Sequence, residues 1–250
     1  MGVWLSSMFV RKADLCEPLA LMASRSLSVR DLFDRKAEQW THKYQMGGAL
    51  EYRSALFKHI VGELCPSSEC ILDFGCGTGH IAASLAKEGH SLVGCDMSSA
   101  MLAEAECLFG EAVQFCRLEP NWTTLPFSTG EFGLVMASSV LEYVEDVALV
   151  LSELARIVRP GGFLLMTVPN MRHPKRWLET AVAFTFCQGP LWPLMRRFER
   201  FSLYGHFLRT SKNRYSARQW FAKCSAVDLA LHRQQSASPG IQLLVMMRDI

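Results

Sequence analysis

The chain has 250 residues, half of them apolar, so it can bury one good core or two small ones, and we expect a globular protein with one domain. Its formal net charge of +2 argues against a general nucleic-acid binder, which would be far more basic. Nine cysteines without a paired CxxC spacing indicate reduced thiols, no structural zinc and a cytoplasmic setting.

The N-terminal part is expected to differ from the rest of the chain. Residues 1–32 are predicted to be a loose leader, and residues 33–250 a single domain. Helices are predicted over 31–44 and 50–64, the second with apolar residues recurring along one face. Pro66 and the serines after it end that second helix.

Short apolar runs follow at 70–74, 91–96, 112–119, 132–139 and 162–168, separated by segments with helical periodicity at 80–89, 98–109 and 144–158. Strands that alternate with helices imply a parallel sheet with right-handed crossovers. After a helix at 216–224, the runs 227–233 and 241–247 are joined by a loop too short for a crossover helix, so we expect them to be antiparallel.

The predicted fold is therefore α/β and Rossmann-like. It has a seven-stranded, mostly parallel sheet with one antiparallel edge strand and helices on both faces. Residues 31–64 add N-terminal helices, and residues 171–215 lie between the fifth strand and the last helix. No segment is long and uninterrupted enough to predict a transmembrane helix.

Residues 72–79 read LDFGCGTG, with three glycines at alternate positions after the first strand. In an open parallel sheet, ligands bind beyond the carboxyl ends of the strands, and glycines let backbone amides approach a ligand closely. The spacing lacks the third glycine of the dinucleotide fingerprint, because that position is His80. A nicotinamide enzyme is therefore less favoured, and a phosphate-binding loop is not indicated.

Asp96 ends the second strand about twenty residues after the glycines. A carboxylate at this place can accept hydrogen bonds from both ribose hydroxyls of a nucleoside, although such an Asp can also simply cap the next helix. In this order and at this spacing, the two features together predict a nucleoside site.

The segments ILDFGCGTGH, LVGCDMSSAML, LPFSTGEFGLVMASSVLEYVED and RIVRPGGFLLMTVPN resemble, in order, the motifs of the class I S-adenosylmethionine-dependent methyltransferases. The resemblance covers roughly residues 33–170. The segment FDRKAEQWTHKY is similar to the cap helix of the small-molecule, type 11-like branch, which includes quinone-biosynthesis enzymes.

The resemblance implies S-adenosylmethionine as the cofactor and assigns its contacts. The methionine end would be held by Asp73 and the loop from Gly75 to Gly79, the ribose by Asp96 and the adenine by Met97. Asn121 replaces the usual Asp at the adenine amino group, Trp122 offers a stacking face, and Ser138 lies beside the methionine. The expected cofactor residues are Asp73, Gly75, Cys76, Gly77, Gly79, Asp96, Met97, Asn121, Trp122 and Ser138.

A second departure from the family is Gly133, where an Asp is usual, and we expect it to lower stability rather than activity. Methyl transfer from a sulfonium needs alignment and exclusion of water, and a base only when the acceptor is a hydroxyl. The candidate bases are His206 and Tyr143, followed by His173 and Tyr204. Helix packing is the alternative explanation for Tyr143, and a solvated loop position for His206.

The resemblance implies that residues 171–215 form a helical lid on the acceptor side. The stretch from Arg172 to Arg218 contains ten Lys or Arg and two acids, a net charge of +8 that leaves −6 for the remainder. The uncharged, aromatic centre of this segment resembles an interfacial element, so residues 177–200 are candidates for peripheral membrane contact. The alternative is that these aromatic residues pack a lid onto the sheet. The basic residues favour an acceptor that carries an anion.

The sequence thus predicts a methyltransferase of a small, apolar or lipid-like acceptor, with O-methylation favoured. Three alternatives remain open: a non-catalytic cofactor-binding subunit, a methyltransferase of protein or nucleic acid, and a nicotinamide oxidoreductase. We expect no metal site. The sequence carries no information on oligomeric state.

Overall fold

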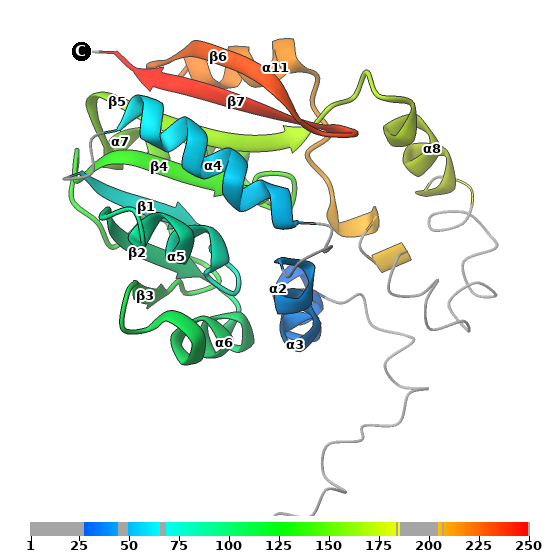
Figure 1. Cartoon of the computed structure of the whole chain (residues 1–250). Helices are drawn as coiled ribbons and strands as arrows, with labels where there is room; N and C mark the ends of the chain where they lie inside the picture. The colour runs from blue at the N-terminus through cyan, green and yellow to red at the C-terminus, as the bar shows by residue number, and fades with distance from the viewer. Residues whose placement is uncertain are drawn as a thin grey trace, which may run out of the picture.

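The computed structural model of the chain describes residues 28–44, 50–65, 69–183, 185, 205–206 and 208–249. It is built around a seven-stranded sheet with the order β3-β2-β1-β4-β5-β7-β6 (Figure 1). The strands are β1 (Cys70–Phe74), β2 (Ser91–Asp96), β3 (Gln114–Arg117), β4 (Phe132–Ser138), β5 (Val158–Pro169), β6 (Leu229–Ser238) and β7 (Ile241–Arg248).

The first five strands pair in parallel, and the chain reverses direction only at its end. β7 is antiparallel to both β5 and β6, so the reversed strand lies one place in from the edge that β6 forms. The predicted Rossmann-like α/β fold, with an antiparallel pair of strands at one edge of a mostly parallel sheet, is confirmed.

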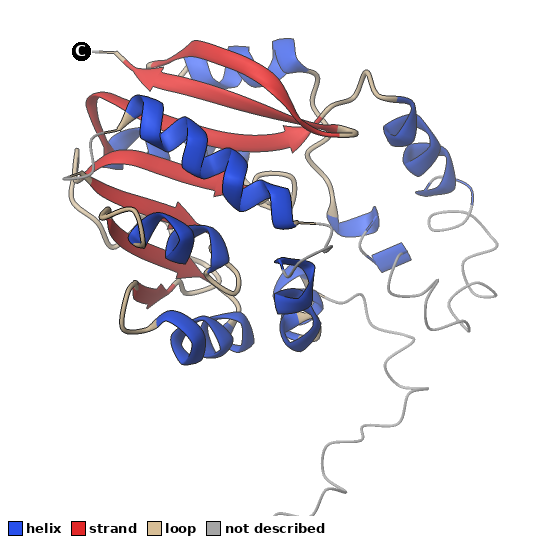
Figure 2. Ribbon diagram, viewed as in Figure 1, coloured by secondary structure: helices blue, strands red, loops and turns tan. Residues whose placement is uncertain are grey.

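Helices cover both faces of this sheet (Figure 2). α4 (Glu51–Leu64) and α5 (His80–Ala86) pack on one face, and α7 (Val147–Ile157) and α11 (Ala217–Ser225) on the other. α6 (Ser99–Phe109) contacts β2 and β3. The central strands β1 and β4 are buried almost throughout, as parallel strands between two helical layers must be. Two apolar cores therefore lie on opposite sides of one sheet.

The predicted cap helix at 31–44 is divided into three short elements: α2 (Val29–Asp34), α3 (Ala37–Trp40) and the 3₁₀ helix η1 (Thr41–Tyr44). α2 begins at a capping box, in which Ser28 and Asp31 each accept a hydrogen bond from the other's backbone amide. In Figure 1, α2 and α3 lie at the edge where β4 and β5 end. The cap therefore stands over the carboxyl ends of the parallel strands, where ligands bind in such sheets.

Part of the predicted lid is described, as α8 (Pro174–Val182), and it projects beyond the end of β5 (Figure 1). Phe184, Phe186, Trp192 and Tyr204 lie outside the described residues.

Gly133 on β4 has a neighbour that explains it. A Cβ at this position would collide with the Glu69 carboxylate, which pairs with Arg159 at 2.6 Å. Glu69 thus occupies the space where a side chain at position 133 would lie. The ion pair of Glu69 with Arg159 therefore fills the space left by the missing side chain. The motif alone does not reveal this replacement.

Candidate functional site

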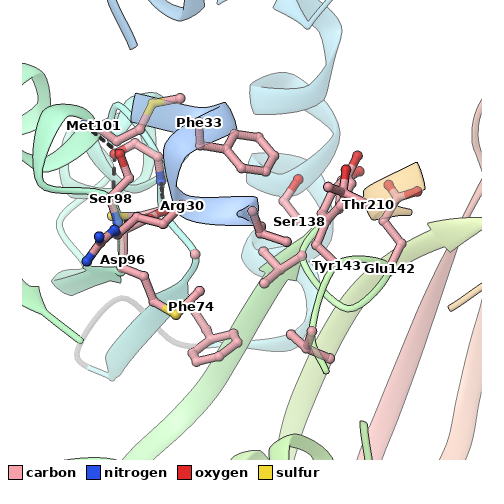
Figure 3. Close-up of a pocket in the computed structure, with 18 of the residues that line it drawn as sticks. Arg30, Phe33, Phe74, Asp96, Ser98, Met101, Ser138, Glu142, Tyr143 and Thr210 are labelled. Atoms are coloured by element: carbon pink, nitrogen blue, oxygen red, sulfur yellow. Dashed lines mark hydrogen bonds between the residues drawn. The ribbon is translucent and has the colours of Figure 1, made fainter. Parts of the chain in front are cut away.

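A cavity of about 1400 Å³ opens at the carboxyl ends of the strands, beneath the cap. Figure 3 shows its two sides: Arg30, Asp96 and Ser98 lie on one, and Ser138, Glu142, Tyr143 and Thr210 on the other. Phe33 of α2 lies between the two groups. Because the loops after β1, β2 and β4 all reach it, the cavity gathers residues that are far apart in the sequence.

The glycine loop after β1 lines this cavity in the way its sequence suggested. Gly75, Gly77 and Gly79 all have positive φ angles, of 72°, 53° and 75°, which only glycine adopts without strain. A Cβ on Gly75 would collide with Val140, and one on Gly79 would lie 2.9 Å from Phe115. The loop thus needs glycine for both its conformation and its packing.

Asp96 both shapes this loop and faces the cavity. Its carboxylate accepts hydrogen bonds from the backbone amides of Gly77 and Ser98, each at 2.9 Å. Burial raises the pKa of Asp96, and these amides oppose the rise. The carboxylate is therefore held in one orientation at the end of β2, where it can still accept from a ribose.

Asp73 is the most unusual polar group in the cavity. It is 1% exposed, and neither carboxylate oxygen accepts a hydrogen bond of normal geometry from the described residues. Burial raises the pKa of Asp73 to about 7, the nearby Asp96 carboxylate adds to the rise, and the Ala82 amide opposes it. A buried carboxylate without a partner is costly, so this group is ready to receive a donor or a cation.

Arg53, on α4, is a site residue that the sequence reasoning missed. It is 5% exposed and lines the cavity, where it donates to the hydroxyls of Ser138 and Ser139 at 3.4 and 3.2 Å. Its Nε has no partner among the described residues. The available signal was its place one turn before Phe57 on the apolar stripe of its helix, where a charge is unexpected.

No ion pair joins Arg53 to Asp73 within the described part of the chain, although both line the same cavity. Each therefore faces it as a separate, buried charge. An amino acid carries an ammonium and a carboxylate, which match an acid and a base presented in this way. The residues present fit the methionine end of S-adenosylmethionine.

The expected adenine contacts also line the cavity, namely Met97, Asn121 and Trp122. Trp122 packs edge-on against Phe74, with 6.1 Å between ring centroids, while Asn121 is exposed. Cys76 lines the cavity too, and burial raises the pKa of its thiol well above the usual value. That thiol stays protonated at neutral pH, so it is a packing residue of the loop rather than a nucleophile.

The two candidate bases both line the cavity and differ in their chemistry. His206 is buried, and burial followed by the charges of Arg209 and Arg35 lowers its pKa, so its imidazole is neutral at pH 7. Burial raises the pKa of Tyr143 well above its usual value, and its ring packs edge-on against Phe33 at 5.3 Å. A neutral imidazole suits a base, whereas a phenol with a raised pKa does not.

Glu142 is a second residue that the sequence reasoning missed. It is 4% exposed, and its carboxylate accepts a hydrogen bond of 2.8 Å from Ser211. Asn213 braces the same loop by donating to the carbonyls of Leu141 and Val144, at 2.9 and 2.7 Å. The segment before α11 thus fixes the loop that carries Glu142 and Tyr143.

The cap is fastened to the core by a few contacts. The Ser98 hydroxyl, which caps α6, donates to Asp34 at 2.5 Å, and the Ala100 amide donates to the same oxygen at 3.3 Å. Phe33 packs edge-on against both Trp40 and Tyr143. Because α2 is only six residues long, these contacts rather than the helix itself hold it in place.

This fold and this loop define a class of protein. Residues 72–166 match the model of the methyltransferase domain family. This match confirms the resemblance to the class I S-adenosylmethionine-dependent methyltransferases of type 11 that the motifs predicted. The cofactor of that family is S-adenosylmethionine.

The particular relatives are small-molecule enzymes. The chain is 35% identical over 117 residues to a ubiquinone biosynthesis O-methyltransferase from Sodalis glossinidius, covering 45% of each chain. It is 37% identical over 98 residues to a demethylmenaquinone methyltransferase from Beutenbergia cavernae, covering 39% of this chain and 40% of that one. The chain thus matches somewhat less than half the length of these curated relatives.

A solved structure supports the fold across most of the chain. The magnesium protoporphyrin IX methyltransferase from Synechocystis, with bound S-adenosylhomocysteine, aligns with a TM-score of 0.65 at 16% identity. The alignment covers 88% of this chain and 98% of that one. At this identity the likeness establishes the fold alone.

Proposed function

We propose that the protein is an S-adenosylmethionine-dependent methyltransferase of a small molecule. The observation that carries the proposal is Asp73, a buried carboxylate with no partner in the cavity beside the glycine loop. The family match over residues 72–166 supports the same cofactor. When bound, S-adenosylmethionine supplies a methyl group on a sulfonium, which is already a strong electrophile.

The residues of this chain would bind the cofactor and exclude water. Asp73 and Arg53 would hold the ammonium and the carboxylate of the methionine, and Asp96 the ribose hydroxyls. Met97 and Trp122 would enclose the adenine, and Asn121 would accept from its amino group. Phe33, above the cavity, would keep water from the reacting atoms.

We propose a small, apolar acceptor at the side of the cavity lined by Ser138, Tyr143 and His206. The curated relatives are named for ubiquinone and demethylmenaquinone, which favours an aromatic acceptor and O-methylation. His206 would then take the hydroxyl proton, because its imidazole is neutral near pH 7. Tyr143 would donate a hydrogen bond rather than accept a proton.

We propose further that the protein works in the cytoplasm and reaches its acceptor at a membrane surface. α8 supports this contact because it buries a charged pair and exposes apolar side chains to solvent. Arg176 and Glu179 are buried and paired at 2.8 Å, while Trp177 and Leu178 are 65% and 66% exposed. No helix in the described part of the chain is long and apolar enough to cross a bilayer, so the contact would be peripheral.

Calorimetric titration of the purified protein with S-adenosylmethionine, S-adenosylhomocysteine and NAD tests the proposal. We expect binding of the first two in the micromolar range and none of the third, because the loop lacks the dinucleotide spacing. Asp96→Ala should weaken binding by about 1.5–3 kcal/mol, since it removes hydrogen bonds to a charged acceptor. Failure of all three ligands to bind would refute the proposal and favour a role as a partner subunit.

A further inference from the structure

Three cations lie close together where the cap meets the cavity: Lys36, Lys43 and Arg53. All three line the cavity, although they come from different elements of the sequence. Like charges at short distance repel, and burial strengthens the repulsion. An anion bound beside Lys43 would be stabilised by the same charges.

The surroundings of Lys43 show how the neighbouring charges affect its ammonium. Its ammonium lies 3.5 Å above the centroid of the Trp40 ring, and Trp40 in turn lies against the glycine loop, with its Nε1 3.6 Å from the place of a Cβ on Gly77. Burial, followed by the charges of Lys36 and Arg53, lowers the pKa of Lys43 to about 8. The ammonium is thus held over the cofactor loop, in surroundings that disfavour its charge.

The carboxylates that line the cavity are largely committed elsewhere. Glu179 pairs with Arg176 and Glu145 with Lys212, and Asp96 accepts two backbone amides. In the described part of the chain, neither Lys43 nor Arg53 forms an ion pair with a carboxylate. A ligand in the cavity can therefore supply a negative charge to these two side chains.

The cofactor alone does not bring enough negative charge. Eight cationic and six anionic side chains line the cavity in the described residues, a net charge of +2. S-adenosylmethionine carries a sulfonium, an ammonium and one carboxylate, so it adds a further positive charge. Its single carboxylate can pair with one of Lys43 and Arg53, and Arg53, which donates to Ser138, is the cation placed for it.

We propose that Lys43, with Lys36 beside it, binds an oxyanion on the methyl acceptor, either a carboxylate or a phosphate. The inference rests on the proposed function, because it assigns Arg53 to the carboxylate of the cofactor. An acceptor held in this way has an apolar body in the cavity and an acid group at the cap, above Trp40. The acceptor is then recognised by its acid as well as by its shape.

Calorimetry on the protein saturated with S-adenosylhomocysteine tests this site with three ligands that share one apolar body. They are 4-butylbenzoate, 4-butylphenyl phosphate and the neutral 4-butylbenzyl alcohol. We expect one of the acids to bind at least about tenfold more tightly than the alcohol, and the preferred acid identifies the source of the oxyanion. Lys43→Gln should abolish that preference and leave the affinity for S-adenosylhomocysteine unchanged.

The matched control is Lys58→Gln, since Lys58 lies on α4 and pairs with Glu88 outside the cavity. It should keep the full preference for the acid. Equal affinity for acids and alcohol, no binding of either acid, or a preference that survives Lys43→Gln would overturn the inference. If S-adenosylhomocysteine does not bind, the proposed function fails, and the same titrations on the free protein still decide whether the oxyanion site exists.

Discussion

At the scale of single residues, Asp73 shows how a group that is ready to bind a ligand can lower the stability of the free protein. A carboxylate buried without a partner favours its protonated form, which is why its pKa rises to about 7. The ammonium of a bound ligand would favour the ionised form instead. Protonation of this one group is therefore coupled both to folding and to cofactor binding.

This coupling predicts a pH dependence with a definite sign. Between pH ~4, where an unfolded Asp titrates, and pH about 7, the folded protein retains a proton that the unfolded chain has lost. The free energy of unfolding should fall as pH rises through that window, by at most about 1.4 kcal/mol per pH unit. Asp73→Asn should remove this slope, as measured by urea unfolding at several pH values.

The same group should release a proton when S-adenosylhomocysteine binds below pH 7. Calorimetry in two buffers with different ionisation enthalpies measures the release directly. The affinity should fall as pH decreases below about 7, because the protonated acid must first be ionised. A binding heat that is the same in both buffers would show that Asp73 is ionised already in the free protein.

At the scale of elements, the acceptor side depends on a brace between segments far apart in the sequence. Asn213 lies just before α11 and donates to two carbonyls of the loop after β4. The Ser211 hydroxyl binds Glu142 in the same loop. The position of the candidate catalytic loop is thus set by residues some seventy positions later.

Asn213→Ala should leave two buried carbonyls without a donor and lower stability by about 1–3 kcal/mol. Because the glycine loop is not touched, affinity for S-adenosylhomocysteine should be kept while methyl transfer falls. Asn170→Ala is the control, since the Asn170 side chain accepts a local amide, from Arg172, in an exposed turn. If both variants lower turnover equally, the brace has no specific role.

At the scale of the whole molecule, the charge is unevenly distributed. The segment from Arg172 to Arg218 carries +8, and its described helix α8 exposes Trp177 and Leu178 beside basic residues. Aromatic and basic side chains together favour the interface of an anionic membrane. Exposed apolar residues and a positively charged stretch of sequence therefore occur in the same segment.

Co-sedimentation with vesicles tests this proposal. The protein should bind phosphatidylglycerol vesicles more than phosphatidylcholine vesicles, and added salt should weaken the binding because it screens the charges. Replacing Trp177 and Leu178 together by serine should reduce binding, whereas the control Leu108→Ser, at a residue that is 45% exposed on α6, should not. Equal losses for both variants would contradict a contact through α8.

The sequence by itself determined the order of the strands and helices, the reversal at the end of the sheet and the cofactor loop. These depend on local patterns: period-two and 3.6-residue alternation, and glycines whose spacing is set by one loop. The residues from Asp73 to Gly79 and Asp96 could be located because they lie at the ends of strands or directly after them. Periodicity alone did not show that the helix at 31–44 is three elements, since its breaks come from packing on α6.

Only the tertiary structure decided which charges line the cavity without forming an ion pair among the described residues. Arg53 lies in a predicted helix and Lys43 in a predicted cap, and neither has a motif that marks it. Their significance depends on distances across the fold, as does the compensation of Gly133 by Glu69. Electrostatic energy depends on separation in space and on burial, and neither can be read from separation along the chain.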